Sequence, residues 1–370
     1  MKGHLVRFPR RLNGLRPHEG EPLARRVLAS SIGERNESFT TSQLEDPELL
    51  LSVCDLLQER VESAPAVVRQ ESEFFYRFVE LPERPIGCFD ERDFFLGEFA
   101  LLTGTVCRIL ATRTEARRWF DRAEAKFACV QNAASHFGRL AYQRLALRVE
   151  ERDFECVLEL APLWVANLQK LELPEDALKC RFLEATAWKE TERYAEAEQV
   201  FNALVGDARR AGNERLAAIA LQNVFQIHAF RGQVDDALAA AREVAPIFTR
   251  LNNRVGLAKL QLGLGYLLRS QANLLGSIEA YRAAQFQFRE IGMRADVAST
   301  HLVLADLLLD AAQPAQAEWE IRAALPVIDE LQLVPEGIAA LSLLRESLRR
   351  RQIDRQALRS LNGYFEELQS

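Results

Sequence analysis

The chain has 370 residues, a length suited to two or three ordinary domains or to one long repeat array. Hydrophobic residues make up 48% and charged residues 27%, which excludes disorder over the whole length. No apolar run approaches the roughly 18 residues of a membrane-spanning helix, and we expect no secretory signal. The net charge of −6 and the pI near 5.6 argue against general nucleic-acid binding.

The first forty residues are basic. Up to Arg35 there are eight basic and three acidic residues, which gives this stretch a charge of +5. The rest of the chain therefore has a charge of −11, since the total is −6. Pro9, Pro17 and Pro22 disfavour a long helix here. We predict a flexible basic arm over residues 1–40, which either moves in solution or docks an acidic surface.

Residues 41–94 are predicted to form a helical N-terminal region. Asp46 with Pro47 indicates the start of a helix that runs to Glu62. A second helix follows Pro65 and is rich in phenylalanine and valine. We expect its apolar face to pack against the first repeat, the alternative being an exposed docking face. No short turn leads into a basic recognition helix, so a helix-turn-helix DNA reader is not expected.

A period of forty residues organises residues 95–370. Small or short apolar residues recur at this step, and further apolar residues follow each of them four and seven positions later. The steps run through Val157, Ala197, Ala237, Ser277, Ala317 and Ala357, with Ala116 one residue out of phase. The pattern predicts seven units.

Each unit is predicted to contain two helices, A and B, because apolar residues recur at three- and four-residue steps. Helix A is typified by residues 257–271 and helix B by residues 275–291. Small residues also recur at one point of helix A, where they let two helix axes approach closely. These are Gly104, Ala185, Gly265 and Ala305.

The units resemble the tetratricopeptide repeat (TPR). Leu264-Gly265 matches the bulky–small pair of its helix A, and Ala197, Phe201 and Leu204 match Ala-x3-Phe-x2-Ala of its helix B. The period is longer than the basic repeat of about 34 residues, and is similar to that of kinesin light chains, maltose-regulator-type activators and Rap-type peptide-sensing regulators. We expect the extra residues to lengthen helix B and its turn. The resemblance implies an all-α fold, a right-handed α-solenoid of about seven helix pairs over 95–370.

The same resemblance implies a ligand groove, because helix A lines the concave face of a TPR superhelix. Asn223 corresponds to an asparagine that bonds the ligand backbone in peptide-binding members, and an amide both donates and accepts. The basic residues would favour an acidic segment or a carboxylate. The alternative is a solvated groove with no specific ligand. The implied lining residues are Arg139, Tyr142, Gln143, Lys179, Thr186, Lys189, Gln222, Asn223, Gln226, Lys259, Tyr266 and Arg269.

Motifs for catalysis or metal binding are not found. The sequence contains no GxSxG elbow, P-loop or HExxH, and none of its histidines has a metal-ligand neighbour at helical spacing. We therefore expect neither enzyme activity nor a cofactor, and interpret His228 and His301 as packing residues.

Asp306 and Asp310 are predicted to lie on a solvated acidic face, with a weak cation site as the alternative. Six cysteines without a CxxC pair indicate reduced, mostly buried thiols of a cytoplasmic protein.

These observations favour a non-catalytic scaffold or adaptor that binds a protein or peptide in the concave face of the array. The first alternative is a peptide-responsive signalling regulator resembling the Rap phosphatases, for which Gln58 and Gln70 are the amides present in the N-terminal helices. The second is a structural subunit of a larger complex. No nucleic-acid or membrane partner is expected, and the oligomeric state stays open.

Overall fold

The computed structural model describes residues 17–32, 34, 39–82, 86, 89–131, 133–330, 345 and 355–369. Every regular element in these ranges is an α-helix. The chain divides into two compact units, Met1–Ala187 and Trp188–Ser370. Of the basic arm predicted for residues 1–40, residues 1–16 lie outside the described part of the chain.

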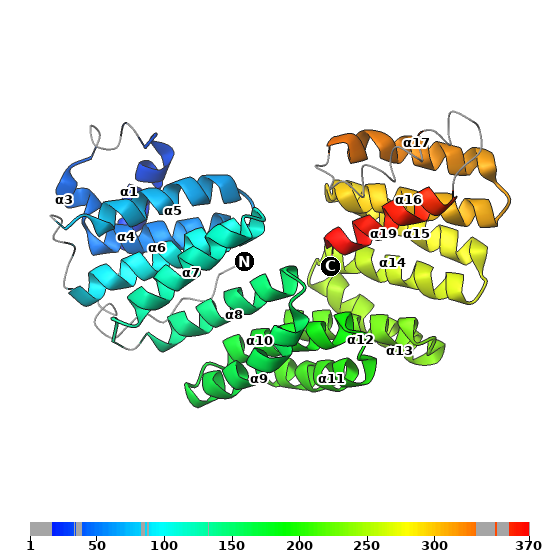
Figure 1. Ribbon diagram of the computed structural model, residues 1–370, viewed down its shortest axis with the longest axis horizontal. Helices are drawn as coiled ribbons and strands as arrows, with labels where there is room; N and C mark the ends of the chain where they lie inside the picture. Colours follow the sequence, from blue (N-terminus) through cyan, green and yellow to red (C-terminus); the bar gives the residue numbers. More distant parts are fainter. Residues whose placement is uncertain are drawn as a thin grey trace. The chain divides into compact units, whose positions relative to one another are not determined.

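The first unit is a set of packed helices (Figure 1). They are α1 (Pro17–Ala29), α3 (Thr41–Leu44), α4 (Pro47–Arg60), α5 (Pro65–Glu80), α6 (Phe89–Ile109), α7 (Arg113–Phe127), α8 (Ala134–Glu150), α9 (Phe154–Lys170) and the greater part of α10 (Pro174–Glu190).

Helix α1 lies within the stretch predicted as an arm. It packs on α4 so closely that a Cβ at Gly20 would meet the carbonyl oxygen of Glu48 at 2.5 Å. Pro17 occupies the first helical position, where no backbone N–H is needed, whereas Pro22 removes one hydrogen bond inside the helix. Ala24 and Val27 are fully buried, and this burial on α4 offsets the loss at the proline.

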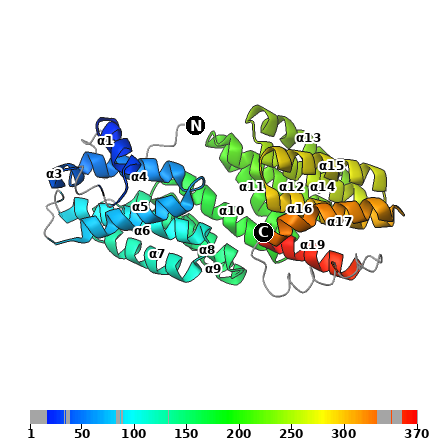
Figure 2. The ribbon, with the colours of Figure 1, turned by 90° about the horizontal axis from the view of Figure 1, so that it is seen from above.

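Helices α4 and α5 confirm the helices predicted from Asp46 and Pro65. The Asp46 carboxylate accepts a hydrogen bond from the backbone N–H of Glu48 at 3.0 Å, which caps α4. The phenylalanine-rich face of α5 packs on α6, where the rings of Phe75 and Phe99 stack at 5.4 Å between centroids. The two helices lie side by side in Figure 2. Packing into the core is therefore the main role of this face.

The repeat begins at α6 and becomes strictly regular from α8. Each helix from α8 to α17 has 17 residues, and three-residue turns separate consecutive helices within this range. The middle residue of each of these turns has a positive φ, and these residues recur every twenty positions from Arg152 to Ala312. Its neighbour donates back into the helix, as the N–H of Gln233 does to His228 O at 2.9 Å. The expectation that helix B alone is lengthened is wrong, because both helices of a pair are equally long.

The second unit continues these pairs from the end of α10 to α17, and α19 packs on α16 (Figure 1). Its helices are α11 (Tyr194–Arg210), α12 (Glu214–Phe230), α13 (Val234–Arg250), α14 (Arg254–Ser270), α15 (Leu274–Glu290), α16 (Arg294–Asp310), α17 (Pro314–Glu330) and α19 (Arg355–Gln369).

The predicted small residues do lie where helices A and B of one pair meet. A Cβ at Gly265 would meet the Tyr281 ring at 2.7 Å, and one at Gly104 would meet the Phe120 ring at 2.6 Å. The hydroxyl of Ser277 donates to the carbonyl oxygen of Gly265 at 2.8 Å across the same contact. Consecutive pairs packed in this way form an α-solenoid. Among the described helices, none is long and apolar enough to cross a bilayer.

Candidate functional site

Three of the implied groove residues meet in the second unit. Lys189 lies at the end of α10, and its Nζ donates to Asn223 Oδ1 at 3.0 Å and to Gln226 Oε1 at 3.3 Å, both on α12. The carboxylate of Glu190 lies 3.3 Å from the same ammonium. The Lys189 side chain is only 15% exposed. We call Lys189, Asn223 and Gln226 the lysine–amide cluster.

The ammonium of Lys189 is desolvated. Burial lowers the pKa of Lys189, the carboxylate of Glu190 opposes this effect, and the charge of Lys259 on α14 makes a smaller lowering contribution. A desolvated ammonium close to a second lysine gains more from an added anion than a solvated one does. The cluster is therefore suited to binding a carboxylate in addition to, or in place of, that of Glu190.

The amides of the cluster keep bonding capacity. Asn223 Nδ2 donates to the carbonyl oxygen of Ile219 at 3.0 Å, which orients the side chain, and Oδ1 accepts from Lys189. An amide has two N–H donors and two acceptor lone pairs, so one of each remains. These groups could pair with the N–H and C=O of an extended backbone, the role that the resemblance implied for Asn223.

Exposed aromatic rings lie beside the lysine–amide cluster. Tyr266 of α14 is 42% exposed and Phe230 of α12 is 47% exposed, and their rings meet edge to face at 5.3 Å. The ring of Tyr194 lies 6.1 Å from that of Phe230, measured between centroids. Phe230 and Tyr194 were missed by the sequence reasoning, although Phe230 follows Gln226 by four residues and so shares its helix face. The rings offer an apolar surface next to the cation.

Gln222 and Arg269 do not join the lysine–amide cluster. Gln222 is buried within the helix packing. Arg269 donates to Asp306 Oδ2 at 2.5 Å and to Asp310 Oδ2 at 3.1 Å, so its charge is balanced inside the fold.

Asp306 of α16 does not lie on the solvated face that was predicted, whereas Asp310 is exposed. Asp306 is only 5% exposed, and its carboxylate also accepts from Arg355 at 2.9 Å and from Arg359 at 3.3 Å, both on α19. Burial raises the pKa of Asp306, but hydrogen bonds from Arg269 and Arg355 outweigh it and lower the value overall. The prediction failed because α19 supplies its arginines from almost fifty residues away.

Arg139, also implied as a groove residue, belongs to a buried ion pair in the first unit. It donates to both oxygens of Glu98 on α6, at 2.8 and 3.0 Å, and to Gln58 of α4 at 3.1 Å. His136 Nδ1 lies 2.7 Å from the same carboxylate. Burial raises the pKa of Glu98, but Arg139 and His136 outweigh it and lower the pKa to about 2. These contacts join α4, α6 and α8.

The other implied residues of the first unit also have partners within the fold. Gln143 accepts from Arg108 at 3.1 Å, and Lys179 pairs with Asp176 at 3.2 Å. Thr186 donates to its own helix, to the carbonyl oxygen of Phe182. Tyr142 packs against the core of α8–α10. The structure therefore groups only part of the implied groove, the part at Lys189, Asn223 and Gln226 with Lys259 and Tyr266 nearby.

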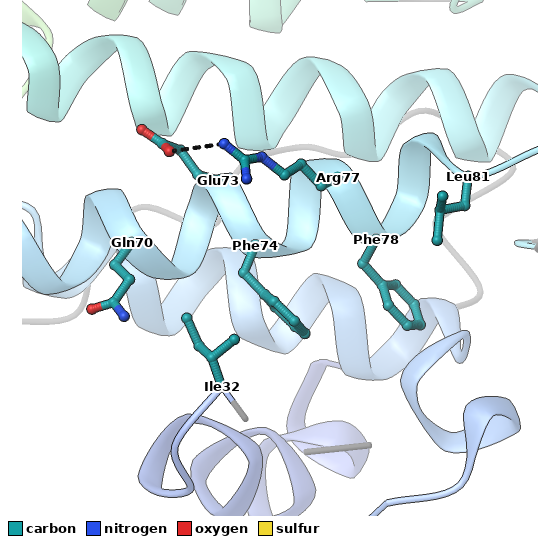
Figure 3. A pocket seen from close by; sticks show the side chains of 7 residues that line it. All are labelled: Ile32, Gln70, Glu73, Phe74, Arg77, Phe78 and Leu81. Carbon is teal, nitrogen blue, oxygen red and sulfur yellow. Dashed lines mark ion pairs between the residues drawn. The ribbon is translucent and has the colours of Figure 1, made fainter. Parts of the chain in front are cut away.

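A separate hollow of about 410 Å³ lies beside α5 in the first unit. Figure 3 shows Phe74, Phe78 and Leu81 on one side of it and Ile32 opposite. Gln70 lies at one end, next to Glu73 and Arg77, which form an ion pair at 3.8 Å. One side of the phenylalanine-rich helix thus borders a hollow, although its other side packs into the core.

Within the described ranges, no three His, Cys, Asp or Glu side chains lie close enough together to hold a metal ion. His228 Nδ1 lies 3.0 Å from Gln233 Oε1, consistent with a packing role. Cys54, Cys107 and Cys180 are buried, and burial raises the pKa of the Cys180 thiol to about 12. Cys88 lies outside the described residues.

Comparison with known proteins shows the fold. No protein-family profile matches the sequence, and no curated protein matches it. Among solved structures, the Rap conjugation gene regulator of plasmid pLS20 in complex with the Phr* peptide is similar with a TM-score of 0.56 and 14% identity, over 88% of this chain and 96% of that one. The quorum sensor NprR from B. thuringiensis has a TM-score of 0.54 and 12% identity, over 81% and 82%. Aspartyl phosphate phosphatase F from Bacillus subtilis has a TM-score of 0.53 and 11% identity, over 75% of each chain. The chain therefore has the TPR-like helix-pair fold that the forty-residue period predicted.

Proposed function

We propose that this protein is a non-catalytic binding protein that holds a peptide or a protein segment on α12, α14 and the end of α10 in its second unit. The observation that supports this most is the lysine–amide cluster, in which a desolvated ammonium is held by two amide oxygens of the neighbouring helix at 3.0 and 3.3 Å. A carboxylate of the ligand would bind Lys189, and the spare amide groups of Asn223 and Gln226 would pair with its backbone. The neighbouring rings of Phe230 and Tyr266 would take an apolar side chain.

The fold supports the same proposal. A stack of helix pairs presents a surface that is already ordered, so binding costs little conformational entropy. Two proteins of similar fold are a regulator in complex with a peptide and a quorum sensor. We propose that the chain acts in the cytoplasm as a scaffold, adaptor or ligand-responsive regulator, in keeping with its buried thiols.

A display library of short linear peptides, selected on the full chain, would test the proposal. We expect enrichment of peptides that place a carboxylate next to an apolar side chain. Binding of a labelled peptide should weaken about tenfold or more in Lys189→Gln, because a hydrogen bond to a charged group is lost. Lys170→Gln, an exposed lysine of α9, is the matched control and should bind normally.

Two results would contradict a ligand site at the lysine–amide cluster. If no peptide is enriched, or if Lys189→Gln and Asn223→Ala bind the selected peptide as tightly as the wild type, the lysine–amide cluster is not a ligand site. A protein that becomes monodisperse only with a permanent partner would instead favour a structural subunit.

A second candidate function rests on the hollow beside α5. An exposed amide, that of Gln70, lies at the edge of this apolar hollow, and one protein of similar fold is an aspartyl phosphate phosphatase. An amide can orient water for attack on a phosphoryl group. In this function the chain would accelerate loss of phosphate from a phosphorylated receiver domain. Activity in the wild type that disappears in Gln70→Ala would support it, and no activity in the wild type would exclude it.

A further inference from the structure

A second hollow, of about 420 Å³, lies between α15, α16 and α17 in the second unit. The three helices stack one on another in Figure 1. This volume falls within the range of about 300–1,000 Å³ that is usual for small-molecule sites. The hollow is lined by Arg289, Gly292, Arg294, Val297, His301, Trp319, Ala323 and Val327.

One wall of the hollow is formed by the exposed side chain of Trp319 and by two valines. Trp319 is 61% exposed, which is costly for so large an apolar side chain in water. Val297 of α16 and Val327 of α17 line the same space. A flat apolar ligand placed against the indole would remove this surface from water and would gain ring–ring attraction.

The inner part of the hollow contains an oriented histidine. His301 is 4% exposed, and its Nδ1 lies 2.5 Å from Oε2 of the equally buried Glu320. The imidazole ring also meets Trp319, at 6.0 Å between centroids and an angle of 65°. Because Nδ1 is committed to Glu320, Nε2 is the ring nitrogen that can bond a ligand.

The rim of the hollow is basic. Arg289 near the end of α15 and Arg294 at the start of α16 are both exposed and flank the turn at Gly292. Gly292 has φ +77°, and nothing lies within 4 Å of where its Cβ would be. None of the lining residues is a carboxylate. The rim therefore attracts an anion, since guanidinium groups bind carboxylates with charge-assisted hydrogen bonds.

We propose that this hollow binds a free small aromatic carboxylate. The ring lies against Trp319, between Val297 and Val327, and the carboxylate pairs with Arg289 at the rim. A polar atom of the ring can bond His301. The site is distinct from the lysine–amide cluster and does not depend on the function proposed for it.

Calorimetric titration of the full chain with indole-3-acetate tests the proposal, with indole-3-acetamide as the uncharged probe of the same shape. We expect saturable binding to one site, with the acid about tenfold tighter than the amide because only the acid pairs with a guanidinium. Arg289→Gln should remove this preference. Arg322→Gln, an exposed arginine of α17 outside the hollow, should keep it.

Two further variants separate the site from general surface effects. Trp319→Ala should abolish binding, whereas Phe286→Ala, which removes another exposed ring (62% exposed) outside the hollow, should not. Ala323→Leu should also abolish binding, because it fills the hollow and leaves the charges in place. Circular dichroism of each variant checks its fold.

The proposal fails if neither probe binds saturably, if acid and amide bind equally, or if Ala323→Leu still binds. It also fails if Phe286→Ala loses as much affinity as Trp319→Ala. Lys189→Gln should leave these titrations unchanged, so a failure here is separate from a failure of the lysine–amide cluster.

Discussion

Replacing Glu98 by glutamine should destabilise the first unit and change its dependence on pH. Glu98 is 4% exposed, and it accepts hydrogen bonds from Arg139 at 2.8 Å and pairs with His136 at 2.7 Å. Glutamine has nearly the same shape but carries no charge. Arg139 and His136 would then lose their carboxylate while remaining inside the packing of α6 and α8.

The size of the effect follows from the pKa of Glu98, which lies at about 2 against an ordinary value of 4.5. At about 1.36 kcal/mol per pH unit, this difference corresponds to about 3 kcal/mol of stability. Because the pKa is depressed in the folded state, this stability is fully present above pH 4.5. It is lost as the pH falls through the window from 4.5 to about 2.

Hydrogen exchange measured by mass spectrometry is the suitable assay, because a chain of two units need not unfold in one step. Peptides from α6 and α8 should lose about 3 kcal/mol of protection at pH 7 in Glu98→Gln. Peptides from α14 and α16 serve as an internal reference. In an acid titration, the free energy of unfolding, measured with urea at each pH and followed by circular dichroism, should fall less between pH 4.5 and 2 in the variant than in the wild type, because only the wild type loses the contribution of Glu98 in this window.

A matched control is Glu115→Gln, which removes the 2.8 Å ion pair with Arg69 at a side chain that is 46% exposed. A solvated pair of this kind contributes less than about 1 kcal/mol. The reasoning is refuted if Glu98→Gln and Glu115→Gln have the same small effect, or if the acid titrations of wild type and Glu98→Gln coincide.

Three other predictions concern packing, the last helix and the thiols. Gly265→Val should destabilise the second unit by about 1–3 kcal/mol in urea unfolding, because the new Cβ would lie 2.7 Å from the Tyr281 ring. The control Gly206→Ala has its nearest atom at 3.7 Å and should raise stability by up to about 1 kcal/mol, because alanine favours the helix more than glycine does. Asp306→Asn should weaken the packing of α19 on α16, which limited proteolysis would detect as faster cleavage within α19. Unchanged cleavage would contradict a stabilising role for the ion pairs of Asp306 with Arg355 and Arg359. Among the five cysteines that the structure describes, Cys129, which is exposed, should react first with Ellman's reagent, and Cys180, with a pKa of about 12, should react only after unfolding.

The candidate site was predictable only in part. Family positions counted from the helix B anchors placed Lys189, Asn223 and Gln226 on one surface, because a forty-residue repeat puts equivalent residues on neighbouring helices. The same counting selected Arg139 and Arg269, and the structure shows both in ion pairs with Glu98 and Asp306. Position in a repeat determines which way a side chain points, but it does not determine which residue type faces that side chain from the neighbouring helix.

The sequence alone determined the helix pairs of the repeat array, although it did not predict α1. A twenty-residue alternation of apolar faces and turns leaves one way to bury every face, and small residues such as Gly265 mark where the helices of a pair touch. Only the tertiary structure decided which charges are available to a ligand. Asp306 looks solvated in its own helix, yet α19 brings Arg355 onto it. The reason is physical: helix periodicity is a local property, whereas burial and ion pairing depend on chain segments that are far apart in sequence.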